Sequence, residues 1–230
     1  MNTARRIDLH MHTMFSDGNL LPSELLRHAA IVGHKAVAIT DHADSSNMES
    51  LLGKMKTFLA DQGGDFGPIL LIGVELTHIA PGSIARLAKR AKELGADLVV
   101  VHGETIVEPV APGTNRAAVE CPFVDLLAHP GFLTEEEARI AGARGCLIEL
   151  TARKGHSLTN GHVARVCRST AALTVINTDT HGPDDLITFE RAQQIAAGAG
   201  LIASEIAQAV ETVPNAFLER CLAARHTHTH

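Results

Sequence analysis

The 230-residue sequence has no tryptophan or tyrosine and only seven phenylalanines. Proteins that hold single-stranded nucleic acid usually stack its bases on aromatic side chains. Basic residues are also scarce, since 20 Lys and Arg stand against 26 Asp and Glu and the formal net charge is −6. Neutralising many phosphates needs the opposite balance. The composition therefore disfavours a nucleic-acid-binding protein and allows nucleic acid only as a locally held substrate.

Paired cysteines and long apolar runs are missing as well. The four cysteines are far apart and form no C-x-x-C pair, which excludes a zinc knuckle and a thioredoxin-type motif and predicts reduced, buried thiols. No apolar run approaches the ~18 residues that a membrane span needs, and no apolar signal region precedes the first predicted strand. We therefore expect a soluble, cytoplasmic protein without a membrane partner.

The common nucleotide-binding motifs are absent too. There is no G-x-G-x-x-G after the first predicted strand and no G-x-x-x-x-G-K-[ST] anywhere. No Pro/Gly/Ser linker or shift of composition marks a domain boundary, and the length suits one substantial core. We predict a single domain over residues 1–225, followed by a disordered His/Thr tail at 226–230.

Seven short apolar segments recur along the chain, with helical patterns between them. The runs are typical of buried parallel strands. Pro22 near the start of one intervening segment and Gly33 after its end fit a helix, and Thr134 is the expected N-cap of another. The alternation predicts an α/β barrel of about seven βα units. The predicted strands are RIDLH, AVAITDH, ILLIGVELT, DLVVVHGE, VDLLAHPG, CLIELTA and LTVINTDTH.

Histidines and carboxylates stand at the ends of these strands. A lone histidine there is usually an ordinary polar residue, but five of the seven strand ends carry at least one. In a βα barrel the carboxyl ends of all strands face one mouth, so the side chains are expected to converge there. Burying them without partners would be costly, which favours a metal site. The residues concerned are His10, His12, His42, Glu75, His102, His129, Glu149, Asp179 and His181.

Other titratable residues have a plainer alternative. Asp17 lies in S-D-G, which is either an ordinary turn or part of the site. Asp41 is expected to orient a neighbouring histidine, Glu149 to have a structural role, and His78 to lie in a loop outside the site. Surface or helix-end positions are expected for His28, His34 and His162.

Taken together, the fragments DLHMHTMFSDG, AITDHAD, IGVELT, VVHGE, LLAHPG and NTDTH resemble, in this order, the motifs of the PHP family, named for its polymerase and histidinol phosphatase members. The resemblance implies a distorted (β/α)7 TIM-like barrel with two or three divalent metal ions. The mixed imidazole and carboxylate donors suit Zn, Mn or Fe, and Mg is also compatible. The ligands that the resemblance implies are His10, His12, Asp17, His42, Glu75, His102, His129, Asp179 and His181.

This site best supports hydrolysis of a small phosphomonoester, either histidinol phosphate-like or a nucleotide. Metals held close together would present a bridging water as hydroxide to the phosphorus, with Glu75 suited to bridge two ions. Arg153, in the loop after the sixth strand, is the expected bidentate phosphate clamp, against the alternative of a solvated basic loop. His156 or a metal-bound water is the expected proton donor to the leaving group.

Three other functions compete with this interpretation. A metal-dependent nuclease or phosphodiesterase would use the same site, although the acidic charge disfavours it. An amidohydrolase would need a lysine at the end of the fourth strand, where this chain has His102. A non-catalytic PHP-like ribonucleoprotein subunit would be basic and would have lost several ligands, and this sequence shows neither feature.

Overall fold

The computed structural model of the protein describes residues 5–227, and its elements follow the predicted alternation of strands and helices. Residues 228–230 of the predicted tail lie outside the described residues, and helix α9 extends to Thr227. The strands are β1 (Arg6–Met11), β2 (His34–Ile39), β3 (His42–Ala43), β4 (Ile69–Leu76), β5 (Leu98–His102), β6 (Leu126–Ala128), β7 (Leu147–Thr151) and β8 (Thr174–Asn177).

Helices occupy the connections and continue after the last strand. They are α1 (Pro22–Val32), α2 (Met48–Gln62), α3 (Pro81–Glu93), α4 (Thr114–Glu120), α5 (Glu135–Arg144), α6 (Asn160–Thr170), α7 (Phe189–Gly198), α8 (Ala203–Ala207) and α9 (Val213–Thr227). Short helical turns lie at His156–Thr159, Pro183–Asp185 and Gln208–Thr212. No helix in residues 5–227 is long and apolar enough to cross a membrane.

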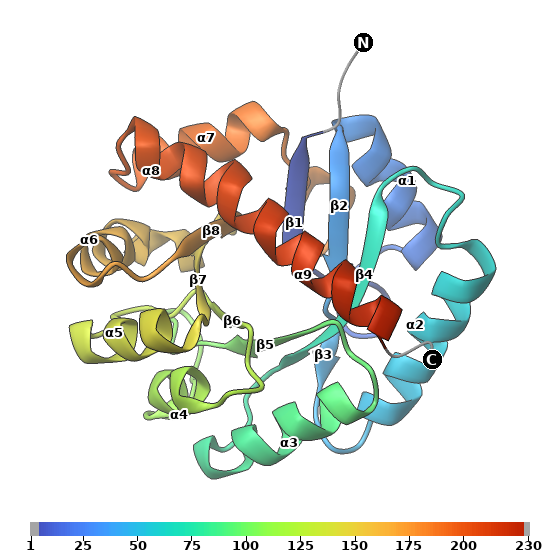
Figure 1. The fold of residues 1–230 in the computed structure, drawn as a ribbon, viewed down its shortest axis with the longest axis horizontal. Helices are drawn as coiled ribbons and strands as arrows, with labels where there is room; N and C mark the ends of the chain where they lie inside the picture. The colour runs from blue at the N-terminus through green and yellow to red at the C-terminus, as the bar shows by residue number, and fades with distance from the viewer. Residues whose placement is uncertain (1–4, 228–230) are drawn as a thin grey trace.

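The strands form a nearly closed parallel barrel in the order β1-β2-β4-β5-β6-β7-β8, with helices around it (Figure 1). The seven main strands are the seven predicted ones, and β3 is a short addition that pairs with β4. The barrel closes between β1 and the end of β8 by a bridge from Met11 to Thr180. The predicted TIM-like α/β barrel is therefore confirmed.

Side chains replace part of the backbone ladder where the barrel closes. The amide of Leu9 donates to the Asn177 side chain at 3.0 Å, and the buried Arg6 guanidinium donates to the Ile176 carbonyl at 2.7 Å. Arg6 also pairs with the buried carboxylate of Asp8 at 2.8 Å. These polar contacts give the buried charges partners, as burial requires.

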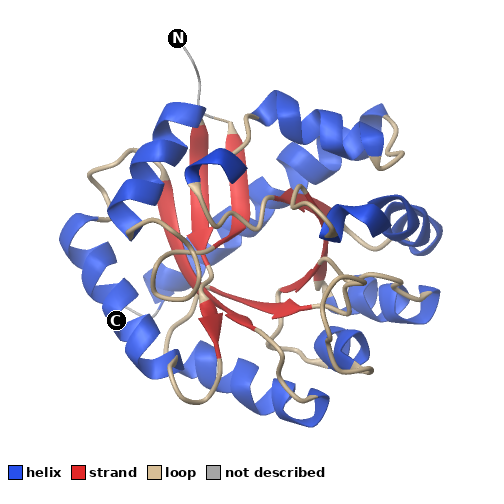
Figure 2. Ribbon diagram, turned by 180° about the vertical axis from the view of Figure 1, so that it is seen from behind, coloured by secondary structure: helices blue, strands red, loops and turns tan. Residues whose placement is uncertain are grey.

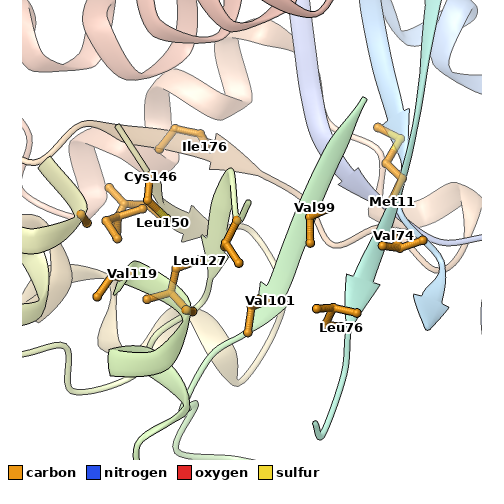
Figure 3. Packing of buried hydrophobic residues seen from close by; sticks show 14 of the residues in the cluster. Met11, Val74, Leu76, Val99, Val101, Val119, Leu127, Cys146, Leu150 and Ile176 are labelled. Atoms are coloured by element: carbon orange, nitrogen blue, oxygen red, sulfur yellow. The ribbon is translucent and has the colours of Figure 1, made fainter. Parts of the chain in front are cut away.

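Two apolar clusters form the core. The larger one lies between strands and outer helices, where Val101, Val119 and Leu127 pack together (Figure 3). The smaller one fills the barrel interior with residues such as Leu9 and Val100, and Phe217 of α9 belongs to it. Helix α9 crosses one end of the barrel in Figure 1, and loops surround the opposite opening in Figure 2. One end of the barrel is therefore covered.

The structure confirms the helix ends that the sequence predicts. Gly33 ends α1 with a φ of 95°, a conformation that favours glycine, and the Thr134 hydroxyl accepts a hydrogen bond from the Glu137 amide at the start of α5. All four cysteines are free and buried, as predicted. His34 begins β2 and is buried, so a surface position is wrong, but its Nδ1 lies 3.2 Å from the Ala29 carbonyl of α1, which agrees with the expected helix-end role.

Candidate metal centre

The strand ends bring the predicted ligands into one cluster at the loop-lined mouth of the barrel. Two buried carboxylates, Glu75 near the carboxyl end of β4 and Asp179 shortly after β8, lie at its centre. Glu75 Oε1 is 3.3 Å from His10 Nε2, and Glu75 Oε2 is 2.9 Å from His42 Nε2. Asp179 Oδ1 is 3.0 Å from His12 Nε2. The two carboxylates therefore connect imidazoles at the ends of two strands, β1 and β3.

Asp17 and His181 complete one side of the cluster. Asp17 Oδ2 is 3.0 Å from His181 Nε2, and Asp17 Oδ1 is 3.6 Å from His42 Nδ1. With His12 they form a group whose donor atoms all lie within 4.8 Å of one another. Of the two alternatives for Asp17, the structure places it with the site.

The opposite side of the cluster is rich in imidazole. His102 and His129 have ring centroids 4.5 Å apart, and His156 stacks on His129 at 4.2 Å. The donor atoms of these three buried histidines also lie within 4.8 Å of one another. His156 therefore lies beside two predicted ligands and not at an exposed loop tip.

Strained backbone turns several of these side chains toward the mouth. His129 has a φ of 27°, Asp179 a φ of 52° and His78 a φ of 53°. Residues other than glycine seldom adopt positive φ, and each such conformation costs about 1–3 kcal/mol. Three of the four such residues in the described chain lie at the site, which indicates that the fold bears this strain to place the donors.

A chain of buried hydrogen bonds fixes the orientation of His10. Its Nδ1 lies 2.8 Å from Glu149 Oε2, and the Asn177 amide donates to the same oxygen at 3.0 Å. This leaves Nε2 of His10 facing Glu75. The structural role expected for Glu149 is therefore to orient His10. A carboxylate that holds the second ring nitrogen of a ligating histidine fixes its tautomer.

Asp41 organises the loop that carries Asp17. Its carboxylate accepts hydrogen bonds of 2.7 Å from the Thr13 amide, the Thr13 hydroxyl and the Ser16 hydroxyl. The prediction that Asp41 orients a histidine is therefore wrong, because its hydrogen bonds go to the loop after β1. No residue pattern in the sequence distinguishes the two arrangements.

Burial and mutual attraction shift the protonation equilibria at the centre. Burial opposes ionisation of Glu75, but the surrounding imidazoles of His10 and His42 hold the pKa of its carboxyl well below the ordinary value. Burial also favours neutral His10, yet the carboxylates of Glu149 and Glu75 raise its pKa well above the usual one. Burial and the neighbouring His102 lower the pKa of His129. The carboxylate of Glu75 is therefore ionised.

The buried donor atoms fit a bound cation. Neither ring nitrogen of His12 or His129 makes a well-aligned hydrogen bond within the described structure, and neither do His10 Nε2 and Glu75 Oε1, although carboxylate oxygens and imidazole nitrogens lie 3.0–3.3 Å apart there. Buried polar atoms normally have partners, and leaving one unpaired costs about 1–3 kcal/mol. Imidazole nitrogens and carboxylate oxygens are the donors that Zn, Mn and Fe take in proteins. These residues could therefore hold divalent metal ions.

The predicted phosphate clamp lies at the rim. Arg153 Nε is 3.3 Å from Asp179 Oδ2, and Nη1 donates to the Asp179 carbonyl at 3.2 Å. Its partly exposed guanidinium lines an opening of about 280 Å³ together with Asp17, His42, Thr77, His78, His102, Glu108, Asp179 and His181. Lys154 is exposed and lines a neighbouring groove of about 730 Å³ that Arg153 also borders.

Sequence reasoning missed one residue of the site and misplaced another. Glu108, in the loop after β5, lies 3.1 Å from His102 Nε2 and 3.3 Å from both His78 Nε2 and His156 Nε2. His78 was expected outside the site, and this prediction is wrong, because its ring also stacks on His102 at 5.2 Å. Glu108 ends no strand, so the pattern that found the other donors could not find it.

Comparisons with known proteins agree with this geometry. The PHP domain family matches residues 8–209. The uncharacterized protein MJ1295 of Methanocaldococcus jannaschii is 48% identical over 94% of this chain and 99% of its own length. A protein of Clostridium botulinum (strain Hall) named a probable phosphatase is 26% identical over 85% of this chain and 86% of its own.

Among solved structures, a chain from the cryo-EM structure of archaeal ribonuclease P with mature tRNA superposes with a TM-score of 0.59. The two sequences are 16% identical, and the superposition covers 95% of this chain and 89% of the ribonuclease P chain. This likeness concerns the fold. On the strength of the family match, which spans most of the sequence and all nine predicted ligands, the chain belongs to the PHP family.

Proposed function

We propose that the protein is a metal-dependent phosphoesterase that hydrolyses a small phosphomonoester. The observation that carries this proposal is the convergence of histidines and carboxylates at the mouth with several buried donor atoms unpaired. Membership of the PHP family and the likeness to a protein named a probable phosphatase support it.

The donors divide among neighbouring positions. The predicted ligands at the centre are His10, His12, Glu75 and Asp179, with Asp17, His42 and His181 on one side and His102 and His129 on the other. Two or three divalent ions held there would activate a water molecule and neutralise the charge that develops on the phosphoryl oxygens. Glu75 faces His10 with one oxygen and His42 with the other, so it serves two positions at once.

Arg153 would bind the phosphate from the rim of the opening. Its guanidinium now contacts Asp179 and lies 3.7 Å from Asp185, and a phosphate in the opening could take the place of these carboxylates. A planar guanidinium makes two parallel hydrogen bonds to a phosphate, which fixes the orientation of the ester as well as its position. Arg153 thus acts as a positioning group for the substrate.

The size of the opening favours a small substrate. At about 280 Å³ it lies at the lower end of the range of small-molecule sites. Lys154, Asp184 and Arg191 line the larger groove beside it. This polar groove could hold the alcohol part of the phosphate ester. A phosphorylated metabolite or a nucleotide fits this arrangement better than a polymer.

A second candidate is a nuclease, or a ribonucleoprotein subunit without catalysis. The fold likeness to a chain of archaeal ribonuclease P favours an RNA partner. The net charge of −6 and the presence of all nine predicted ligands favour the phosphomonoesterase.

The deciding experiment measures metal content and turnover together. The purified protein is stripped with a chelator, reloaded with Mn or Zn, and supplied with p-nitrophenyl phosphate, bis(p-nitrophenyl) phosphate and single-stranded DNA. We expect bound metal and turnover of the monoester. Turnover of only the diester and DNA would favour the nuclease, and no bound metal with no turnover would refute the enzyme.

A further inference from the structure

We infer that His156 is a metal ligand, which together with His102 and His129 forms a three-imidazole subsite closed by the carboxylate of Glu108. This inference rests on the proposed metal centre and assigns to it two residues beyond the nine predicted ligands. It also replaces the role of proton donor that the sequence predicts for His156.

The first argument is the placement of His156. It is buried although it begins a short turn after β7, and its ring stacks on that of His129 with an interplanar angle of 22°. The neighbouring His129 is buried and has no hydrogen-bond partner on either ring nitrogen. With His102 these two histidines form a group whose donor atoms all lie within 4.8 Å of one another, which is close enough for one cation.

The second argument is how the other ring nitrogens are held. His156 Nδ1 is hydrogen-bonded to the Thr105 hydroxyl at 2.7 Å, and His102 Nδ1 donates to the Gly103 carbonyl at 3.2 Å. Metal-ligating histidines are usually fixed in this way through the nitrogen that does not bind the metal. In both residues this leaves Nε2 to face the subsite and Glu108.

The third argument is the position of Glu108. One of its oxygens is 3.1 Å from His102 Nε2, and the other is 3.3 Å from His156 Nε2. A single carboxylate thus meets the free nitrogens of both histidines. Its loop also approaches the turn that carries His156, since a Cβ atom added to Gly155 would lie 3.3 Å from Val107. Glu108 is therefore placed as the fourth donor, on the solvent side.

The donor set indicates which ion this subsite prefers. Three imidazoles and one carboxylate suit zinc and similar transition metals better than magnesium, which takes oxygen ligands. The opposite side of the cluster, with Asp17, offers more oxygen. The two sides are therefore expected to differ in metal preference, with the tighter zinc position at His156.

Metal binding tests the inference without relying on activity. Wild type, His156→Ala, Glu108→Gln and the control His162→Ala are stripped and reloaded with Zn or Co. His162 is a partly buried histidine of α6 that is bonded to the Leu133 carbonyl, away from the subsite. We expect His156→Ala to lose one bound ion or to weaken its affinity by about tenfold or more, because disturbing even a group that orients a ligand costs 10–100-fold. The visible spectrum of bound cobalt should change with it.

Activity then separates a ligand from a proton donor. Loss of a ligand should lower turnover of p-nitrophenyl phosphate and of an alkyl phosphate by similar factors. Loss of a general acid should spare the p-nitrophenyl ester, whose leaving group needs no proton. If circular dichroism shows that His156→Ala does not fold, His156→Gln takes its place in both measurements.

The outcomes distinguish the two proposals. Full metal content and an unchanged cobalt spectrum in folded His156→Ala would overturn the assignment of His156 and leave the phosphoesterase intact. A wild type that binds no metal would overturn both. Loss of metal from Glu108→Gln, smaller than the loss from His156→Ala, would support the capping role of Glu108.

Discussion

The two ends of the barrel differ in what they bury: apolar side chains at one end and polar donor atoms at the other. At the end covered by α9, apolar residues such as Phe217 fill the interior, and the buried charge of Arg6 is paired with Asp8. At the mouth, donor atoms are buried without partners and the backbone of His129 and Asp179 is strained. Stability is therefore concentrated at one end and the capacity to bind ligands at the other. Substitutions at the two ends should have separable effects.

The largest effect is expected at the mouth. The double substitution His10→Ala with His12→Ala removes two central donors and should abolish binding of at least one metal ion. Metal ions contribute several kcal/mol to catalysis, so activity should fall by about 10³-fold or more. Metal analysis, turnover of p-nitrophenyl phosphate and circular dichroism measure the three quantities. The matched control is His28→Ala with His162→Ala, and an active double variant would refute the assignment of His10 and His12.

The reverse result is expected at the covered end. Phe217→Ala removes a buried ring of α9 and should lower the free energy of unfolding by about 3–5 kcal/mol. The metal content of the folded protein should not change. Urea unfolding and metal analysis check both statements, with the exposed Ile31→Ala on α1 as control. A loss of metal at unchanged stability would show that the two ends are not separate.

The hydrogen-bond chain behind His10 tests how far the mouth depends on its supports. Glu149→Gln keeps the size of the side chain but removes the carboxylate that holds His10 Nδ1. Metal affinity should fall by about 10–100-fold, as for other groups that orient ligands. Competition with a chelating dye measures it. Unchanged affinity would mean that His10 is oriented by its other contacts.

The smallest effect concerns pH at the covered end. Burial and the Arg6 charge lower the pKa of His34 to about 3, against 6.5 when unfolded. Between these values the unfolded chain binds a proton that the folded one does not, so stability falls as pH falls through this window. At pH 5.5 the loss is about 1.4 kcal/mol. His34→Gln should show a weaker fall between pH 7.5 and 5.5 in urea unfolding, and an equal fall would contradict the role of His34.

The barrel could be predicted from the sequence because its strands are continuous apolar runs. The same runs locate His10, Glu75 and Asp179, since each lies within two residues of the carboxyl end of a buried strand. Site residues that lie in loops, such as Glu108, follow no apolar run and so could not be located in this way. Glu108 reaches the site only because its loop folds back over His102, and Asp41 bonds to a loop that precedes it by 25 or more residues. These placements depend on tertiary packing and not on local pattern.

The position of helix α9 also affects how small molecules can reach the cluster. Because α9 covers one end of the barrel, the proposed substrate and product would enter and leave the cluster through the loop-lined mouth, where Arg153 borders the opening. Inorganic phosphate released there would meet the same Arg153 guanidinium that we propose as the group that binds the ester. For the proposed phosphomonoesterase we therefore expect competitive inhibition by phosphate.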